Sequence, residues 1–327
     1  MMKVVLLDGQ SLVGHNFEIE KKIFAEHGIE FSVEECTSEA EVIEKSCGAD
    51  GVMSVYSIVN RDVIDTLKNC KVLLRYGIGY DVIDVAAASD AGIAVCNLPT
   101  YCLQDVALHT IALILNALRK ITVGDRSVRR GEWNNGFGGD SHRPNKLTIG
   151  FLGFGNIARY TAKYASSFEM TMIAFDPFLS DQIFEAANVK RVSFDELLAS
   201  SDIISIHAPM TEQSKHIINK DTLAKMKDGV IIVNTSRGGL ICFDDLVDAI
   251  QSGKVQSVNL DVVEREPLLD YDRRILQFEN VTITPHTAYN SIEAVLEMHT
   301  TAAQSVCSVL FGKLPSNTVN LQQLNEI

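Results

Sequence analysis

The segment Thr148-Ile-Gly-Phe-Leu-Gly-Phe-Gly-Asn-Ile-Ala158 decides the fold of this chain. It predicts a buried strand, a glycine turn and the start of a helix, and Asp176 follows 18 residues later, after the next predicted strand. Gly153 allows a tight turn, and Gly155 lets the backbone approach a pyrophosphate at the helix N-terminus, where unpaired N–H groups point outward. The segment therefore predicts a βαβ unit that binds a dinucleotide.

The residues around Asp176 bear on which dinucleotide is bound. Asp176 lies where a carboxylate accepts hydrogen bonds from the adenosine ribose hydroxyls, and its charge repels a 2′-phosphate. Pro177 and Phe178, which follow it, offer no arginine for such a phosphate. Ala158 replaces the third glycine of the usual fingerprint and still permits close packing of helix on strand. We therefore expect NAD rather than NADP.

The composition is that of an ordinary globular protein. A length of 327 residues predicts about two domains, and the hydrophobic content of 46% and charged content of 22% fit this class. The formal net charge of −13 argues against nucleic acids and acidic membrane surfaces as partners, because phosphate binding needs clustered lysine and arginine.

The cysteines and the N-terminus bear on the cellular compartment. The seven cysteines are scattered and never spaced as Cys-x-x-Cys, so we expect reduced thiols in a cytoplasmic protein, with no disulfide framework and no metal site. The opening Met-Met-Lys-Val-Val-Leu-Leu-Asp favours a first strand over a signal peptide. No apolar run approaches the length of a membrane span, so we expect no membrane partner.

Two series of strand-like runs alternate with amphipathic segments, which is typical of parallel α/β sheets. The first series has five runs: Lys3–Asp8, Ile29–Glu34, Gly51–Val55, Lys71–Leu74 and Ile93–Cys96. The second has six: Thr148–Leu152, Thr171–Phe175, Asp202–Ile206, Val230–Asn234, Ser257–Asp261 and Val281–Thr284. The fold class is therefore α/β, with a flavodoxin-like doubly wound domain and a Rossmann NAD-binding domain.

Two long helical patterns mark the passages between these domains. Gln104–Arg119 precedes the second series of strands, and Ser291–Phe311 follows it. We therefore expect a discontinuous substrate domain, residues 1–100 plus 290–327, and an NAD-binding domain, residues 101–289. A cleft between two such domains is a common place for a small-molecule site.

Three further motifs follow the glycine turn, each at the end of a predicted strand, where open α/β sheets bind ligands. They are Asp202-Ile-Ile-Ser-Ile-His207-Ala-Pro209, Val233-Asn-Thr-Ser-Arg-Gly-Gly239, and Leu260-Asp-Val-Val-Glu-Arg-Glu-Pro267 joined to Thr284-Pro-His-Thr-Ala288. Over nearly the whole chain, this ordered set resembles the D-isomer-specific 2-hydroxyacid dehydrogenases. The stretch Arg75-Tyr-Gly-Ile-Gly-Tyr-Asp81-Val-Ile-Asp84 is similar to the substrate-binding loop of that family.

The resemblance implies three catalytic residues. Arg237 corresponds to the arginine that binds the carboxylate and carbonyl oxygen of the substrate, and a guanidinium suits an anion that can be gripped bidentately. His286 corresponds to the general acid for the carbonyl oxygen, or the base in the oxidative direction, and histidine titrates near neutrality. Glu266 corresponds to the carboxylate paired with that histidine.

The resemblance also implies the cofactor and substrate contacts. Beyond Gly153, Gly155 and Asp176, the residues assigned to NAD are Asn156 and Ile157 beneath the pyrophosphate, His207 beside the pocket, Thr235 and Ser236 on the nicotinamide side, and Asp261 at the nicotinamide amide. Backbone N–H groups of Ile78 and Gly79 are assigned to the substrate carboxylate. The hydride chemistry itself belongs to the cofactor.

Three alternatives to a D-2-hydroxyacid dehydrogenase are considered. Formate dehydrogenase has a related fold but pairs its histidine with glutamine, so Glu266 argues against it. An NAD-sensing binding protein like the C-terminal-binding-protein corepressors keeps the same catalytic residues. The absence of long disordered extensions and of a basic tail argues against it, and the intact catalytic residues argue against a relic without turnover.

The remaining expectations concern assembly and substrate. We expect a homodimer, with the Gln104–Arg119 helix as a candidate interface, and no regulatory domain of the kind found in the longer phosphoglycerate dehydrogenases. The substrate is a small 2-oxo or 2-hydroxy acid. Pyruvate, hydroxypyruvate, glyoxylate, phosphohydroxypyruvate and branched 2-oxo acids all share the head group that Arg237 would bind.

Overall fold

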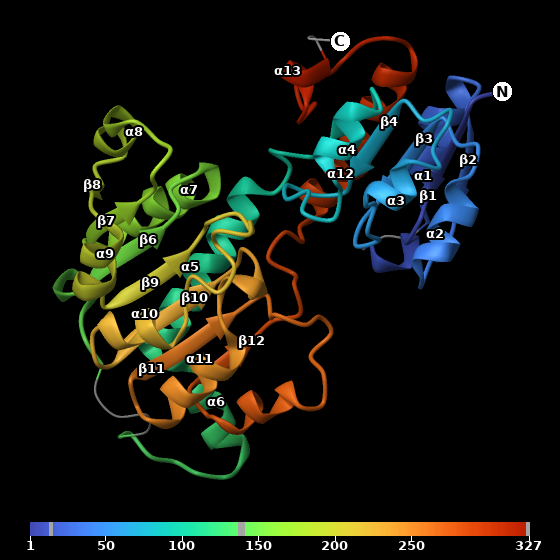
Figure 1. Ribbon diagram of the computed structural model, residues 1–327. Coiled ribbons are helices and arrows are strands. Elements are labelled where there is room, and N and C mark those ends of the chain that lie inside the picture. The colour runs from blue at the N-terminus through green and yellow to red at the C-terminus, as the bar shows by residue number, and fades with distance from the viewer. Residues whose placement is uncertain (13–15, 137–140, 325–327) are drawn as a thin grey trace. The chain divides into compact units, whose positions relative to one another are not determined.

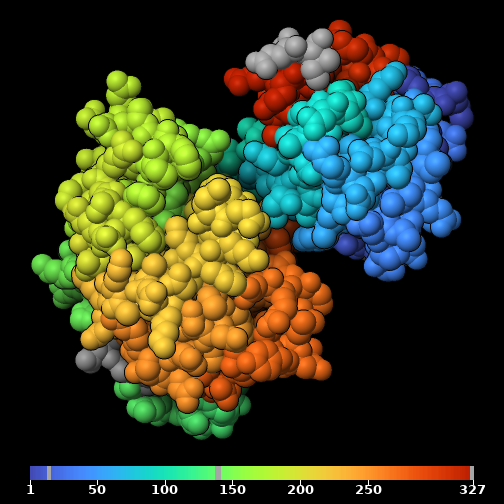
Figure 2. Space-filling view, viewed as in Figure 1, coloured from blue at the N-terminus to red at the C-terminus, as the bar shows by residue number. Residues whose placement is uncertain are grey.

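The computed structural model describes residues 1–12, 16–136 and 141–324. The chain divides into two compact units, which we call the terminal unit (Met1–Cys102 with Asn290–Ile327) and the central unit (Leu103–Tyr289). Figure 1 labels most of the helices and strands of each unit. In Figure 2 the C-terminal segment, in red, lies against the cyan part of the N-terminal segment, so both ends of the chain build the terminal unit.

The terminal unit is a five-stranded parallel sheet with helices on both faces. Its strands, in the spatial order β2-β1-β3-β4-β5, are β1 (Lys3–Leu6), β2 (Glu30–Val33), β3 (Gly51–Ser54), β4 (Val72–Arg75) and β5 (Ala94–Cys96). Its helices are α1 (Glu18–Glu26), α2 (Glu39–Ser46), α3 (Arg61–Ile64), α4 (Val85–Asp90), α12 (Ile292–Leu310) and α13 (Leu321–Leu324), with a 3-10 turn at Gly9–Ser11. Val4 and Leu6 pack into one hydrophobic cluster and Val5 and Leu7 into the other, as expected for a strand buried on both faces.

The central unit is built on a seven-stranded parallel sheet. Its strands, in the order β12-β11-β10-β9-β6-β7-β8, are β6 (Thr148–Leu152), β7 (Thr171–Phe175), β8 (Lys190–Arg191), β9 (Ile203–Ile206), β10 (Val230–Asn234), β11 (Val255–Leu260) and β12 (Val281–Ile283). Its helices are α5 (Leu103–Arg119), α6 (Ile121–Arg129), α7 (Asn156–Ala165), α8 (Asp181–Ala186), α9 (Phe194–Ser200), α10 (Lys220–Lys225) and α11 (Phe243–Gln251). Short 3-10 turns lie at Pro144–Lys146, Ser166–Phe168, Gly238–Leu240 and Asp272–Gln277.

The alternation of side chains along the buried strands gives this sheet two apolar faces. In β10, Val230 and Ile232 join one hydrophobic cluster, and Ile231 and Val233 join the other. Helix α5 packs against α7 and against β10 and β11, as Figure 1 also shows. The strand order reverses between β6 and β9, and in open α/β sheets such a switch point is where ligands bind.

The predicted fold class is confirmed, with one strand missing from the prediction. All eleven predicted runs correspond to strands, but the second sheet has seven strands rather than six. The seventh, β8, is a two-residue edge strand whose lysine and arginine are both exposed. It carries no apolar periodicity, so no hydrophobic pattern could reveal it.

All seven cysteines are free thiols, and burial raises the pKa of Cys70 to about 12 and that of Cys96 to about 11. Among the described residues, no single helix is long and apolar enough to cross a membrane. The two helices α5 and α6 together are long and apolar enough to cross a membrane by length and composition alone, but they are bent by 62° where they meet.

Candidate active site

The predicted site residues of the central unit gather at one edge of its sheet. Gly153 follows β6, Asp176 follows β7, and His207 follows β9. The Asn234–Arg237 turn follows β10, and Asp261 and His286 come directly after β11 and shortly after β12. Because all seven strands are parallel, these carboxyl ends share one edge, which includes the switch point between β6 and β9.

The glycine turn has the shape that a pyrophosphate site requires. Gly153 has a φ of +85°, and a Cβ atom there would lie 2.7 Å from the backbone nitrogen of Ala208, so only glycine fits. Gly155 is the N-cap of α7, and a Cβ atom there would meet no atom within 4 Å. Helix α7 begins at Asn156 and Ile157 with no side chain capping its N-terminus, so its first N–H groups suit an anion. The residues present therefore fit a dinucleotide.

Asp176 lies beside this turn, held by the backbone. Its Oδ2 accepts a hydrogen bond from the backbone N–H of Phe154 at 2.9 Å, and its Oδ1 accepts one from Phe178 at 3.0 Å. Sequence reasoning missed a neighbour, Arg191 of β8, whose Nη2 donates to the carbonyl oxygen of Asp176 at 3.2 Å. Arg191 also pairs with Asp181 at 2.7 Å. An arginine thus stands next to the predicted ribose-binding acid, although it lies 15 residues further along the chain.

His207 is a neutral histidine at the end of β9. Burial lowers its pKa to about 3, because a charged ring would lose its hydration there. Its Nε2 lies 2.8 Å from Oγ of Ser205, and its backbone N–H bonds to Leu152 of the neighbouring strand. The His207 backbone therefore packs on the glycine turn at Gly153, and its ring is not suited to acid–base chemistry near neutral pH.

The turn after β10 is fixed by its own side chains. Asn234, fully buried, donates from Nδ2 to the carbonyl oxygen of Arg237 at 2.8 Å and accepts from the N–H of Ser236 at 3.0 Å. Ser236 donates to the carbonyl of Ala208 at 2.6 Å, and the buried Thr235 hydroxyl lies 2.8 Å from that of Thr110. These bonds hold the half-buried Arg237 at the edge of the sheet.

His286 and Glu266 form a hydrogen-bonded pair. Nδ1 of His286 lies 2.7 Å from Oε2 of Glu266, and the other carboxylate oxygen accepts from the N–H of Val263 at 3.1 Å. The two side chains are 25% and 31% exposed, so a ligand can reach them. His286 has a φ of +53°, and its N–H bonds to the carbonyl oxygen of Asp261 at 2.8 Å. Because Nδ1 faces a carboxylate, Nε2 is the ring atom suited to exchange a proton with a substrate.

Asp261 holds the loop that carries His286. Its side chain is 1% exposed, and it accepts hydrogen bonds from the Thr284 hydroxyl and from the N–H groups of Thr287 and Ala288. Nε2 of His109 in α5, a residue that carries no motif in the sequence, lies 3.0 Å from the Thr284 hydroxyl and 3.6 Å from Oδ1 of Asp261. Helical periodicity carries no signal for such a long-range contact.

Ile78 and Gly79 belong to the terminal unit, in the loop after β4. Asn97 donates to the carbonyl oxygen of Ile78 at 2.6 Å, and Leu98 donates to that of Gly77 at 2.9 Å. Gly77 has a φ of +135°, and a Cβ atom there would collide with the Arg75 guanidinium. The loop is therefore shaped by glycine and anchored by the segment that follows β5.

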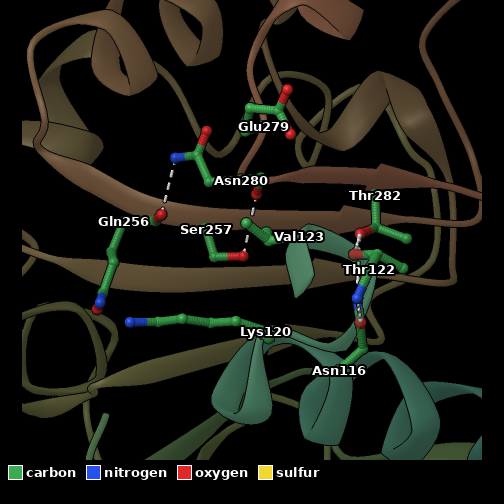
Figure 3. Close-up of a pocket in the computed structure, with 10 residues that line it drawn as sticks. Asn116, Lys120, Thr122, Val123, Gln256, Ser257, Glu279, Asn280 and Thr282 are labelled. Carbon is green, nitrogen blue, oxygen red and sulfur yellow. Dashed lines mark hydrogen bonds between the residues drawn. The ribbon is translucent and has the colours of Figure 1, made fainter. Parts of the chain in front are cut away.

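A separate cavity in the central unit lies at the other edge of the sheet (Figure 3). Among its lining residues, Gln256 and Ser257 are near the start of β11, and Asn280 directly precedes β12. Its polar groups bond to one another, as Asn280 Nδ2 does to the Gln256 carbonyl at 2.8 Å. Among the residues that the structure describes, no group of three or more His, Cys, Asp or Glu side chains could hold a metal ion.

The architecture and the glycine turn define a Rossmann-type dinucleotide-binding unit. Residues 111–288 match the family model of the NAD-binding domain of D-isomer specific 2-hydroxyacid dehydrogenases. The chain is 34% identical over 324 residues to a hydroxypyruvate reductase of Blautia hydrogenotrophica, covering 98% of this chain and 100% of that protein. The chain therefore belongs to the D-isomer-specific 2-hydroxyacid dehydrogenase family, and its central unit contains the NAD-binding domain of that family.

Two further similarities agree with this assignment. A D-3-phosphoglycerate dehydrogenase of Archaeoglobus fulgidus is 39% identical over 300 residues, which are 91% of this chain but 56% of that protein. The chain thus spans little more than half the length of this relative. The crystal structure of a glyoxylate reductase from Paecilomyes thermophila has a TM-score of 0.86 at 32% identity, covering 98% of this chain and 99% of that one.

Proposed function

We propose that this chain catalyses the reversible, NAD-dependent interconversion of a small 2-oxo acid and the corresponding D-2-hydroxy acid. The observation that carries the proposal is the His286–Glu266 pair, at the same sheet edge as the Arg237 turn and the glycine turn of α7. Similarity to proteins named as dehydrogenases and reductases supports it. Those names favour an enzyme over the alternative of an NAD-sensing binding protein.

The proposed role of each residue follows from its chemistry. NAD, when bound, supplies the hydride chemistry. The Arg237 guanidinium binds the carboxylate and carbonyl oxygen of the substrate and stabilises negative charge that develops on that oxygen. His286 delivers a proton to the same oxygen from Nε2 during reduction and takes it back during oxidation. Glu266 accepts a hydrogen bond from Nδ1 and so fixes the tautomer and the orientation of the ring.

The remaining assignments stay with this proposal. Asn156 and Ile157 at the start of α7 bind the pyrophosphate through backbone N–H groups, and Asp176 binds the adenosine ribose. Thr235, Ser236 and Asp261 border the nicotinamide; for Asp261 the structure supports an added role in holding the His286 loop. In the terminal unit, backbone N–H groups of Ile78 and Gly79 bind a substrate carboxylate.

We further propose that the protein acts in the cytoplasm as a homodimer. Helix α5, the candidate interface, buries much of its apolar side within the central unit and leaves Leu108 62% exposed. The neighbouring α6 exposes Ile121 and Val128, which would extend such an interface. Sedimentation of the purified chain tests the dimer.

The experiment that tests the function is a substrate panel. NADH oxidation is followed by absorbance with pyruvate, hydroxypyruvate, glyoxylate, phosphohydroxypyruvate and branched 2-oxo acids, with NADPH in parallel. Turnover of at least one acid, lost in a His286 variant, supports the enzyme and identifies its substrate class. Tight NADH binding without turnover of any acid would favour the NAD-sensing binding protein instead.

A further inference from the structure

A second histidine–glutamate pair lies in the central unit, beside the turn that carries Arg237. Nε2 of His216 is 2.5 Å from Oε1 of Glu264, and the two side chains are 35% and 27% exposed. The other oxygen of Glu264 accepts from the N–H of Phe243 at 3.4 Å, at the N-terminus of α11, where a carboxylate is favoured. Neither residue has a part in the proposed reaction.

His216 is joined to the Arg237 turn through its backbone. Its N–H donates to the carbonyl oxygen of Gly239 at 2.9 Å, two residues after Arg237. Its own carbonyl oxygen accepts from Nδ2 of Asn219 at 2.9 Å, and Asn219 caps α10. The His216 backbone thus holds one end of the Arg237 turn through this hydrogen bond to Gly239.

Glu264 is joined to the same turn from the other side. A Cβ atom on Gly238 would lie 1.9 Å from the carbonyl carbon of Val263 and 2.4 Å from the backbone nitrogen of Glu264. The turn therefore packs directly on the Val263–Glu264 peptide, and only glycine permits this approach. The His216–Glu264 bond links the two backbones that enclose the turn.

The segment that carries Glu264 also carries the partner of His286. The N–H of Val263 donates to Glu266 at 3.1 Å, and Glu266 bonds to His286 at 2.7 Å. Residues 263–266 therefore contact two parts of the site. The Val263–Glu264 peptide packs on the Arg237 turn, and Glu266 bonds to His286. A shift of this segment would move the proposed anion-binding group relative to the proposed proton donor.

We propose that His216 and Glu264 are positioning residues, which hold the Arg237 turn in register with the Glu266–His286 pair. This inference rests on the proposed function. Neither side chain is assigned a contact with substrate or cofactor; they act through the backbone of the turn. Reacting groups displaced by about 1 Å can lose ~10²-fold in rate, so a modest loosening of the turn has a measurable effect.

The test is a double-mutant cycle in which kcat/KM is measured with a 2-oxo acid that the wild-type protein reduces. His216→Asn suits the left-handed backbone at this position (φ +50°) but is too short to keep the bond, and Glu264→Ala removes the other partner. We expect each single variant to lose about 10-fold in kcat/KM for the acid, mainly through KM, with NADH affinity changed less than about twofold. We expect the double variant to be no worse than the poorer single variant, because one shared bond is lost.

Arg265 supplies a matched control in the same segment. It makes a two-point ion pair, at 2.8 and 2.6 Å, with Asp272 of the Asp272–Gln277 turn and not with a residue of the Arg237 turn. Arg265→Gln removes the charge of this pair but keeps an amide that can donate to the buried Asp272, so we expect kcat/KM to stay within about twofold of the wild type. An equal loss in Arg265→Gln, additive losses in the double variant, or unchanged kinetics in both single variants would overturn the inference. A wild-type protein that turns over no acid would instead contradict the proposed function.

Discussion

Nδ1 of His286 faces Oε2 of Glu266 at 2.7 Å, and the backbone of the same histidine is bonded to Asp261 in a left-handed conformation. The side chain and the backbone of this residue are therefore fixed by two different partners. Asp261 places the loop, and Glu266 orients the ring through Nδ1, so that Nε2 is the atom to which we assign the proposed proton exchange. This arrangement permits a substitution that removes the proposed proton donor and spares the loop.

His286→Asn is that substitution, because asparagine tolerates a positive φ better than alanine does. We expect turnover of the 2-oxo acid to fall ~10²–10⁴-fold, the usual contribution of a general acid. NADH affinity, measured by fluorescence titration, is expected to stay within about twofold, because the ring is assigned no role in holding the cofactor. Unchanged turnover would show that another group supplies the proton.

Arg237 is expected to matter for the acid and not for the cofactor. Arg237→Lys keeps the positive charge but loses the planar fork that binds a carboxylate bidentately. We expect KM for the 2-oxo acid to rise about 10-fold or more, with NADH affinity nearly unchanged. Arg237→Gln, which also loses the charge, should be worse. An equal loss of substrate and NADH affinity in both variants would contradict the assignment.

Sequence reasoning predicted most of this fold because its strands are buried on both faces. Runs such as residues 230–233 are continuous and apolar, and the glycine turn directly follows another of them, Thr148–Leu152. The strand ends then placed Arg237 and His286 at one edge without any structure. The edge strand β8 has neither an apolar run nor a glycine turn. Its two residues, Lys190 and Arg191, are exposed, and the strand pairs with β7 at the edge of the sheet.

The support around the site could not be predicted in the same way. The contacts of His109 with Thr284 and of His216 with Glu264 join segments 175 and 48 residues apart in the chain. A periodic pattern reports which face of an element is buried, but it does not report which distant polar group a side chain meets. Glu264, one member of a short acidic run, reads from sequence as a solvated residue until its partner is known.

Asp176 and Arg191 together predict how cofactor preference can be changed. Asp176→Asn removes the charge that repels a 2′-phosphate and leaves Arg191 bonded to the carbonyl oxygen of residue 176. We expect the ratio of kcat/KM for NADPH to that for NADH to rise about 10-fold, the scale of a charge-assisted hydrogen bond. Adding Arg191→Gln should reverse most of this gain. A ratio unaltered by Asp176→Asn would place Asp176 outside the ribose site.

We expect His207 to contribute to the loss of folding stability at low pH. Its pKa is lowered to about 3 by burial, whereas an unfolded histidine titrates near about 6.5. Between these values the unfolded chain binds the extra proton, so stability is complete above about pH 6.5 and is lost as the pH falls toward 3. His207→Gln removes this titration and keeps a group able to bond to Ser205.

The measurement is the free energy of unfolding in urea at about pH 7 and about pH 5, for the wild type and for His207→Gln. We expect the loss of stability between these pH values to be smaller in the variant by about 1–2 kcal/mol. Other carboxylates and histidines titrate in both proteins, so their effects cancel in the comparison. Equal losses would mean that the His207 ring is protonated in the folded protein at about pH 5.

The two glycines of the turn predict opposite outcomes for the same substitution. In Gly153→Ala the new Cβ atom has a positive φ and lies 2.7 Å from the Ala208 nitrogen, so the backbone must move. We expect the variant to lose about 1–3 kcal/mol of stability and to melt at a lower temperature. In Gly155→Ala the Cβ atom meets nothing within 4 Å and φ is −68°, so we expect a nearly unchanged melting temperature.

NADH titration completes the comparison between the two variants. If Gly155 gives the pyrophosphate its close approach to the backbone, Gly155→Ala should lower NADH affinity about 10-fold or more in a protein of native stability. The Gly153→Ala variant confounds binding with folding, so the Gly155→Ala result decides the question. Native NADH affinity in Gly155→Ala would place the pyrophosphate away from the start of α7, and the assignment of Asn156 and Ile157 would fail with it.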